Sequence, residues 1–241
     1  MSDVVATKTI SYSTASDFLE CQRLYEFKHI QKRREPKSQA MEFGTIMDLA
    51  YDEYYRTRSL ESSIAVIEAA WQGDVLEETG RTKDRAIKTM RMYVERWQDD
   101  GVEVIVASHR TLQSIPIPGT DYLFTFKLDK IIKWDNAHYV YEGKITSQLT
   151  GNTLNRYNPN LQLKLYVWAA RRMNLPVSPL IVGSLIDVTC VAVSKIDFKR
   201  DLFMQTAQED AEVEQVLRDI IIDIESRTAL NAFRPTWAAC S

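Results

Sequence analysis

The stretch FTFKLDKIIKWDNAHYVYEGKITSQ, residues 124–148, decides how this sequence is interpreted. It holds two hydrophobic runs, one interrupted by Asp129 and the other by Glu142 and Lys144. Because strand side chains alternate, Val140, Glu142 and Lys144 share one face of a strand. If the two strands pair, Asp129 reaches the same region, and two carboxylates beside a lysine suit a hard divalent cation. The spacing fits equally well a cross-strand salt bridge on a solvated sheet face, which contributes only about 0.2–1 kcal/mol.

Outside this stretch the apolar spacing separates strands from helices. Alternating or continuous apolar residues predict strands at 102–114, 122–133 and 138–145, forming an antiparallel meander, and a further strand at 180–193. Helical spacing predicts helices at 14–34, 43–59, 60–78, 82–98, 159–173 and 203–226. We expect one α/β domain over 1–241, with a helical part (about 11–100), a sheet core (about 101–200) and a C-terminal helix (about 203–227).

Composition and charge exclude several classes of protein. The 30 Lys and Arg against 33 Asp and Glu give a net charge of −3, which rules out coating nucleic acid by bulk positive charge but permits a local basic groove. Apolar residues at 45% and charged residues at 26% argue against disorder. No apolar run approaches the roughly 18 residues that cross a bilayer, and the start MSDVVATKTI is polar. We therefore expect a cytoplasmic protein without membrane contact.

An aspartate followed about a dozen residues later by Glu-x-Lys, on consecutive strands, resembles the PD-(D/E)XK nuclease superfamily. In that resemblance Asp129 is the first acid, Glu142 the second and Lys144 the lysine, and Thr146 and Ser147 resemble the polar tail of the motif. The resemblance implies a restriction-endonuclease-like core, in which a mixed central sheet is flanked by helices.

Three further matches resemble the RecB-like branch, which includes CRISPR-associated adaptation nucleases and many phage exonucleases. SYSTASDFLECQRLYEFKHI (11–30) resembles its first helix, FGTIMDLA (43–50) resembles its G-x-x-x-H helix start, and NLQLKLY (160–166) resembles its Q-x-x-x-Y helix. The chain departs from the branch at two positions, with Asp48 in place of a histidine and Phe126 in place of a glycine. An aspartate can still ligate Mg²⁺ or Mn²⁺, because hard cations prefer oxygen.

The resemblance also implies roles for the site residues. Asp129, Glu142 and Asp48 would hold one or two Mg²⁺ or Mn²⁺ ions, and the backbone carbonyl of Gly143 or Ile145 would add an oxygen ligand. Lys144 would orient or help deprotonate the attacking water and stabilise negative charge. Gln162 and Tyr166, four residues apart on one helical face, would position the lysine, the water or a phosphate. Packing of an amphipathic helix is the plainer explanation of this last pair.

Many RecB-like nucleases hold an iron–sulfur cluster with four cysteines. Cys21 matches the first ligand position, and Cys240 follows a segment that resembles the approach to the second. Cys190 lies in an apolar strand and is expected to be a small core residue. An ordinary cluster needs four thiolates, so we expect no complete Fe–S cluster in this chain.

DNA contacts would come from basic residues on two helices and from aromatic rings that stack on single-stranded bases. The basic candidates are Lys28, Lys32, Arg33, Arg34 and Lys37, then Arg81, Lys83, Arg85, Lys88 and Arg91. The aromatic candidates are Tyr25, Tyr51, Tyr54, Tyr55, Trp71 and Trp97, most of which we expect to pack in the core.

The leading hypothesis is a metal-dependent DNA exonuclease of a bacterium or phage-infected cell, acting in recombination, end processing or spacer acquisition. Its partner would be DNA with single-stranded ends, and the chain could assemble with copies of itself or with a recombination protein. Two alternatives remain: a catalytically impaired nuclease-fold module that binds DNA or assembles with protein, and a structural α/β protein whose three charged residues form a surface ion-pair cluster.

Overall fold

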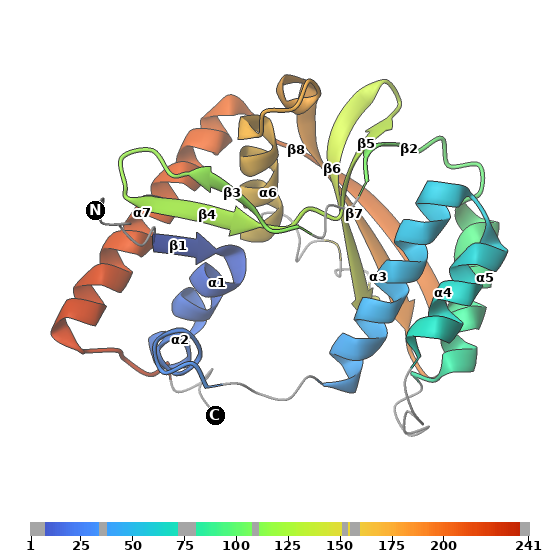
Figure 1. The fold of residues 1–241 in the computed structure, drawn as a ribbon, viewed down its shortest axis with the longest axis horizontal. Coiled ribbons are helices and arrows are strands. Elements are labelled where there is room, and N and C mark those ends of the chain that lie inside the picture. Colours follow the sequence, from blue (N-terminus) through green and yellow to red (C-terminus); the bar gives the residue numbers. More distant parts are fainter. Residues whose placement is uncertain are drawn as a thin grey trace, which may run out of the picture.

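The protein is described by a computed structural model that covers residues 8–33, 38–71, 81–107, 111–150, 154 and 160–236. Within these ranges, helices pack on two β-sheets and make a mixed α/β fold with a helical N-terminal half (Figure 1). The expected fold class is therefore confirmed. No helix among the described residues is long and apolar enough to span a membrane.

The larger sheet has five strands in the order β2 (Glu103–Val106), β5 (Lys130–Trp134), β6 (Ala137–Thr146), β7 (Ile181–Val191) and β8 (Ile196–Met204). Only β6 and β7 run parallel; the other neighbours are antiparallel. A parallel pair needs a crossover connection, and here it includes helix α6 (Leu161–Arg172). The crossover places α6 against the face of β6 that carries Glu142.

The smaller sheet has three strands in the order β1 (Lys8–Ser11), β4 (Tyr122–Phe126) and β3 (Gln113–Pro116). β1 runs parallel to β4, and β3 runs antiparallel to it. Two faces of the molecule are thereby covered by different helices.

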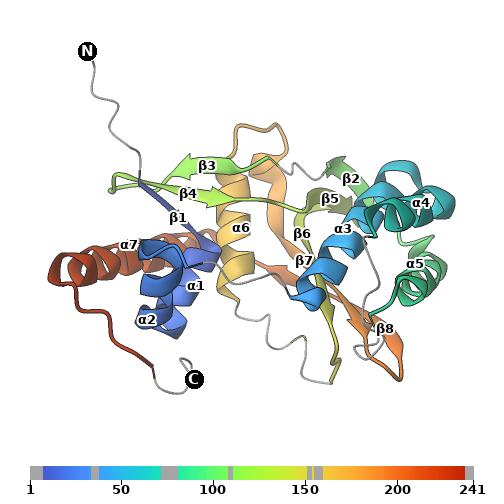
Figure 2. The same ribbon diagram turned by 60° about the horizontal axis from the view of Figure 1, so that its bottom comes forward.

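One apolar core lies between the small sheet and helices α1 (Tyr12–Glu20), α6 and α7 (Ala207–Leu230), and it includes Phe124 and Trp168. The second core lies under α3 (Gln39–Thr57), α4 (Leu60–Ala70) and α5 (Lys83–Trp97), on the other face of the large sheet. Figure 2 shows these two helix groups on either side of the strands. Val140 belongs to the first core and Tyr141 to the second, so the side chains of β6 alternate as expected.

Three strand predictions need correction. The predicted strand 122–133 is two strands, because β4 hydrogen-bonds within the small sheet and β5 within the large one. The predicted strand 102–114 likewise becomes β2 and β3, on different sheets. β2, β5 and β6 do pair antiparallel in that order, so the meander is correct only for the large sheet. Strands β1 and β8 were not predicted, whereas the strand at 180–193 is confirmed as β7.

The predicted helix 14–34 is not continuous. The backbone leaves the helical conformation at Cys21, where φ is −157° and ψ is 112°, and resumes as α2 (Gln22–Tyr25) and a π-helical turn (Glu26–Ile30). The sequence could not reveal the break, because Phe18, Cys21 and Tyr25 stay buried at helical spacing on both sides of it. Ser11 caps α1, because its hydroxyl accepts a hydrogen bond from Thr14 N.

The other predicted helices are confirmed, with bounds shifted by a few residues. Helix α4 ends at Ala70, because the backbone of Trp71 is extended, so the predicted helix 60–78 is shorter than expected. Positions 72–78 of that prediction lie outside the described residues. The expectation of a single domain over 1–241 stays a prediction.

Candidate active site

The first acid of the motif lies where the chain crosses from one sheet to the other. Phe126 ends β4, Lys130 begins β5, and Asp129 is the last residue between them. The Asp129 carboxylate accepts a hydrogen bond of 2.8 Å from the backbone N–H of Gly143, on the neighbouring strand β6. This bond fixes Asp129 beside the strand that carries Glu142 and Lys144.

Glu142 and Lys144 form an ion pair of 2.6 Å on one face of β6. Gln162, from α6, donates a second hydrogen bond of 2.7 Å to the same Glu142 oxygen, Oε1. Only 4% of Glu142 is exposed, so this pair is not the solvated surface cluster of the structural alternative. Lys144 from β6 and Gln162 from α6 therefore both bind the carboxylate of Glu142.

Asp48 approaches the site from α3, on the opposite face of β6. A methyl group added at Gly143 would lie 3.6 Å from Asp129 Oδ2 and 4.0 Å from Asp48 Oδ1. Both carboxylates thus border the same small space beside the Gly143 backbone, which the missing side chain leaves open.

Two carboxyl groups of the cluster have raised pKa values despite the nearby lysines. Burial, and then the negative charge of Asp129, raise the pKa of Glu142 to about 7, although Lys144 opposes the shift. The Asp48 side chain is exposed, and local desolvation followed by the charge of Asp129 raises its pKa to about 7, a shift that solvent screening limits. These carboxylates would be stabilised in their charged form by added positive charge.

The pKa of Lys144 is raised as well, which for a lysine favours the charged form. Burial alone would lower the pKa of its ammonium, but the charge of Glu142 and their hydrogen bond outweigh burial and raise the pKa above its ordinary value. Burial, followed by the charge of Glu142, raises the pKa of Tyr166 to about 12. Tyr166 therefore stays a neutral hydroxyl beside the carboxylates.

The donor set fits a hard divalent cation in residue type, because it consists of carboxylate oxygens around an open space at Gly143. Among the described residues, however, no group of three or more Asp, Glu, His or Cys side chains is already gathered closely enough to hold a metal ion. A bound cation would have to draw the carboxylates of Asp48, Asp129 and Glu142 together. Ligation by the carbonyl of Gly143 or Ile145 stays a prediction.

The cysteine predictions are tested only in part. Cys21 is buried at the break between α1 and α2, and Cys190 is a buried residue of β7, as expected for a core position. Cys240 lies outside the described residues, as do Arg34 and Lys37 of the basic cluster.

Several predicted DNA-contacting side chains have structural partners instead. Tyr25, Tyr51, Tyr54 and Tyr55 are all buried, which confirms that most of the aromatic candidates pack in the core. Arg85 donates to the carbonyl oxygens of Ala192 and Lys195, in the segment that joins β7 to β8. Lys28 pairs with Asp17 at 3.3 Å, and Arg33 lies over the ring of Phe27.

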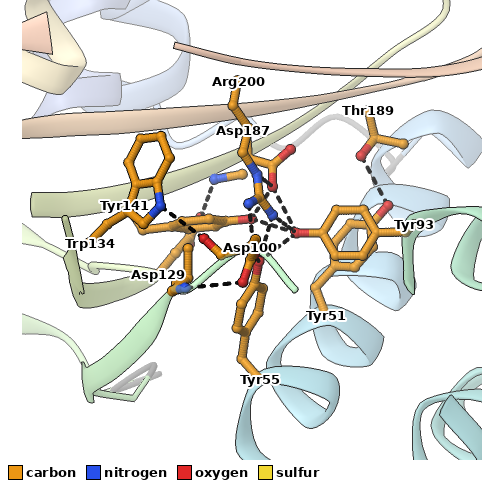
Figure 3. Close-up of polar contacts among 12 residues, drawn as sticks. Tyr51, Tyr55, Tyr93, Asp100, Asp129, Trp134, Tyr141, Asp187, Thr189 and Arg200 are labelled. Carbon is orange, nitrogen blue, oxygen red and sulfur yellow. Dashed lines mark hydrogen bonds and ion pairs between the residues drawn. The ribbon is translucent and has the colours of Figure 1, made fainter. Parts of the chain in front are cut away.

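A second polar cluster, which we name the Arg200 network, was not predicted. It lies on the α3–α5 side of the large sheet and is centred on Asp187 of β7, which is opposite Gly143 in the β6–β7 ladder (Figure 3). Asp187 Oδ2 accepts hydrogen bonds of 2.7 Å each from Tyr93, Tyr141 and Arg200. The members of the Arg200 network are Tyr55, Tyr93, Asp100, Tyr141, Asp187 and Arg200.

Arg200 pairs with both carboxylates of this cluster, and Arg58 lies 3.7 Å from Asp100 Oδ1 as well. The Arg200 guanidinium donates to Asp100 at 2.7 Å and to the Tyr55 hydroxyl at 2.6 Å, and it lies 3.9 Å from the Trp97 ring centroid. Asp100 and Asp187 are 3% and 2% exposed at their side chains, so the cluster is removed from water. Its one unsatisfied atom among the described residues is Asp187 Oδ1.

Lys130 is a further buried cation that the sequence did not single out. It directly follows Asp129, is 4% exposed, and pairs with Asp52 of α3 at 3.1 Å. Its ammonium also lies 4.2 Å from the ring centroid of Tyr141. Its charge lowers the pKa of Asp48, which places it next to the catalytic candidates.

The mixed α/β fold and the placement of Asp129, Glu142 and Lys144 around β6 agree with what the resemblance implies. Residues 9–241 match the family model of the PD-(D/E)XK nuclease superfamily, so the chain belongs to this superfamily. A structure from Eubacterium rectale, named "Putative exonuclease", shares 14% identity over 95% of this chain and 85% of that one, with a TM-score of 0.57. At this identity the likeness shows the fold alone.

A second structure, that of the protein SSO0001, also shares 14% identity, covering 86% of this chain and 85% of that one. Its TM-score is 0.33. No curated protein matches this sequence.

Proposed function

We propose that this nuclease is a metal-dependent DNA exonuclease that acts on DNA ends during recombination or end processing. The observation that carries the proposal is the arrangement around β6, the central strand of the large sheet: Glu142 and Lys144 pair on this strand, and Asp129 is hydrogen-bonded to the Gly143 N–H between them. Asp48 and Gln162 join them from α3 and α6. Neither a solvated ion pair nor helix packing requires this convergence of acids with raised pKa values.

Asp48, Asp129 and Glu142 would hold Mg²⁺ or Mn²⁺, which supplies charge neutralisation at the phosphate and a more acidic water. Asp129 is held in place for this by the Gly143 N–H. Burial, and then the charge of Asp129, disfavour the ionised form of Glu142, and a bound cation would stabilise that form in competition with a proton.

Lys144 keeps its proton, because the charge of Glu142 raises the pKa of its ammonium. It can therefore orient a water and stabilise negative charge on the phosphate oxygens. Gln162 fixes the other side of Glu142 Oε1, so that both neighbours hold this carboxylate in one orientation. Tyr166, on the same helix, offers a neutral hydroxyl donor.

The proposal is tested with purified protein and DNA labelled at the 5′ or the 3′ end, single- or double-stranded, in Mg²⁺, in Mn²⁺ and in EDTA. Circular single-stranded DNA of the same length distinguishes the two modes of attack. We expect metal-dependent release of nucleotides from linear DNA and no cutting of the circle. Rapid cutting of the circle would contradict exonuclease activity and show that the protein is an endonuclease.

The matched variants are Glu142→Gln, which keeps the size of the side chain, and Glu212→Gln, which makes the same change at an exposed position on α7. We expect Glu142→Gln to remove cleavage and Glu212→Gln to retain it. Full activity of folded Glu142→Gln would contradict the site.

A nuclease-fold module that binds DNA without cutting it is the second candidate. Two observations favour it: Asp48 stands where the resemblance expects a histidine, and the described acids are not gathered into a ready metal site. It predicts DNA binding that survives in EDTA, with no cleavage in either metal.

A further inference from the structure

A cavity of about 510 Å³ opens between helices α3 and α4 and the edge strand β2. Its apolar walls come from Leu49 of α3, Val66 of α4, and Val104, Ile105 and Ala107 on or just after β2. Its polar wall comes from Asp52, Glu53, Tyr55, Arg56 and Lys130. The volume is within the range of small-ligand pockets and exceeds that of one nucleobase.

Residues that line the cavity are neighbours in the chain of the catalytic candidates. Leu49 adjoins Asp48 in the chain, Asp52 lies one helical turn further along α3, and Lys130 adjoins Asp129. The charges of Lys130 and Asp52 both act on the pKa of Asp48, which agrees with this proximity. The cavity therefore adjoins the candidate site through Leu49 and Lys130, the chain neighbours of Asp48 and Asp129.

The charges of the polar wall are paired with one another. Arg56 binds Glu53 through two hydrogen bonds, of 2.9 and 2.6 Å, and Lys130 pairs with Asp52 at 3.1 Å. Two acids and two bases leave no excess positive charge for a phosphate, which needs cations free to bind it. Apolar walls beside fixed hydrogen-bonding groups match instead an aromatic heterocycle with polar edges.

We infer that this cavity, which we name the base pocket, receives the unstacked terminal base of the DNA strand that the active site cuts. The inference rests on the proposed nuclease function and adds to it a substrate feature, a free terminal nucleotide. The base leaves its neighbours, packs against Leu49, Val66 and Ile105, and presents its edge to the Glu53–Arg56 pair. Bases inside a duplex or a circle cannot enter without unpairing or unstacking.

The test compares single-stranded oligonucleotides that end in a normal nucleotide with matched ones whose 5′ or 3′ terminal nucleotide is abasic. Cleavage gives kcat/KM, and fluorescence anisotropy with Glu142→Gln protein gives binding without cleavage. Burial of one base corresponds to about fivefold to a hundredfold in affinity. We expect a loss of this size for the abasic oligonucleotide at one of its two ends.

Ile105→Trp fills the base pocket from a partly exposed strand position, and Val193→Trp adds the same bulk at an exposed residue after β7, away from the pocket. In the Glu142→Gln background we expect Ile105→Trp to bind normal and abasic ends equally, and Val193→Trp to keep the difference. Val66→Trp serves as a second filling variant if Ile105→Trp lowers the Tm.

Equal binding of normal and abasic oligonucleotides at both ends overturns the base pocket, even where cleavage is rapid. Discrimination that survives in both filling variants overturns it too. Failure of the proposed function has a different signature, namely no metal-dependent cleavage of any oligonucleotide by the wild-type protein.

Discussion

Two polar clusters lie on neighbouring parts of the same sheet, and they differ in how their charge is satisfied. In the Arg200 network, one guanidinium and two tyrosine hydroxyls bind a single oxygen of Asp187, and water is excluded. In the active-site cluster, Lys144 and Gln162 share one oxygen of Glu142, while Asp48 and Asp129 face an open space at Gly143. The two clusters contain similar residue types.

The difference indicates which cluster works on a substrate. A buried network with nearly every group satisfied stabilises one arrangement of strands and helices and leaves nothing to bind. A cluster of acids with pKa values raised to about 7 is costly to keep and is stabilised by an added cation. We therefore expect substitutions in the active-site cluster to change activity, and substitutions in the Arg200 network to change stability.

The largest effect is expected for Asp129→Ala. Loss of this carboxylate removes a metal ligand and frees the Gly143 N–H, so kcat/KM should fall by about a thousandfold or more. Thermal unfolding should change little, because Asp129 is only half-buried. Cleavage assays and melting curves are measured on the same preparation. A large fall in the Tm with unchanged activity per folded molecule would contradict the assignment of Asp129 to the active site.

Arg200→Met should produce the reverse pattern. Among the described residues, Arg200 alone supplies a guanidinium to Asp187, so its removal leaves two buried carboxylates without it, at a cost of about 3–5 kcal/mol in the free energy of unfolding. Arg218→Met, at a more exposed ion pair on α7, should cost about 1 kcal/mol or less. Denaturant unfolding measures both.

A drop in kcat for Arg200→Met with unchanged stability would mean that the Arg200 network takes part in the reaction, and the division between the two clusters would fail.

Gly143→Ala sharpens the comparison at one atom. The added methyl would lie in ordinary contact with Asp129 and Asp48, where the space for a cation is expected, so the fold should tolerate it. We expect apparent metal affinity to fall by about tenfold to a hundredfold, the range found when groups beside metal ligands change. Titration of cleavage against Mg²⁺ concentration gives the affinity. Unchanged affinity would place the metal elsewhere.

The smallest effect is expected for the stability of Asp48→Asn. The folded pKa of Asp48, about 7, lies above its ordinary value of 3.8, so ionisation opposes folding as the pH rises between these values. The metal-free variant should therefore melt slightly higher than the wild type at pH 8, and the gap should narrow as the pH falls below 7. Solvent exposure of Asp48 keeps the effect small. A difference in Tm between Asp48→Asn and the wild type that grows as the pH falls would contradict the predicted direction of the pKa shift of Asp48.

The sequence predicted best what depends on local periodicity. The apolar spacing of α3, α5, α6 and α7 located these helices, and the alternation of β6 placed Glu142 and Lys144 on one face. The sequence analysis failed where one apolar run serves two sheets. Residues 122–133 look like one continuous strand, yet β4 ends at Phe126 in the small sheet and β5 begins at Lys130 in the large sheet. Hydrogen-bond partners, not composition, decide such a break.

The Arg200 network was missed for a related reason. In β8, the sequence IDFKRDLFM carries charges that resemble a solvated edge, and nothing local marks Arg200 as buried. Its burial follows from its pairing with Asp187, opposite it on the neighbouring strand β7, and with Asp100, which is 100 residues away in the chain. The spacing of Asp129, Glu142 and Lys144 fits a salt bridge equally well, so only the resemblance that this spacing carries singled out these residues as a candidate site. Asp48 was found only through the resemblance, and Lys130 was not found.

The central claim is that Asp129 and Glu142 hold a divalent cation beside Lys144. The most direct measurement is anomalous diffraction from crystals of the wild-type protein soaked in Mn²⁺. The account predicts a manganese peak coordinated by oxygens of Asp129 and Glu142, next to the Gly143 backbone. Well-diffracting crystals at saturating Mn²⁺ with no peak there, and with Glu142 still bound only to Lys144 and Gln162, would contradict it.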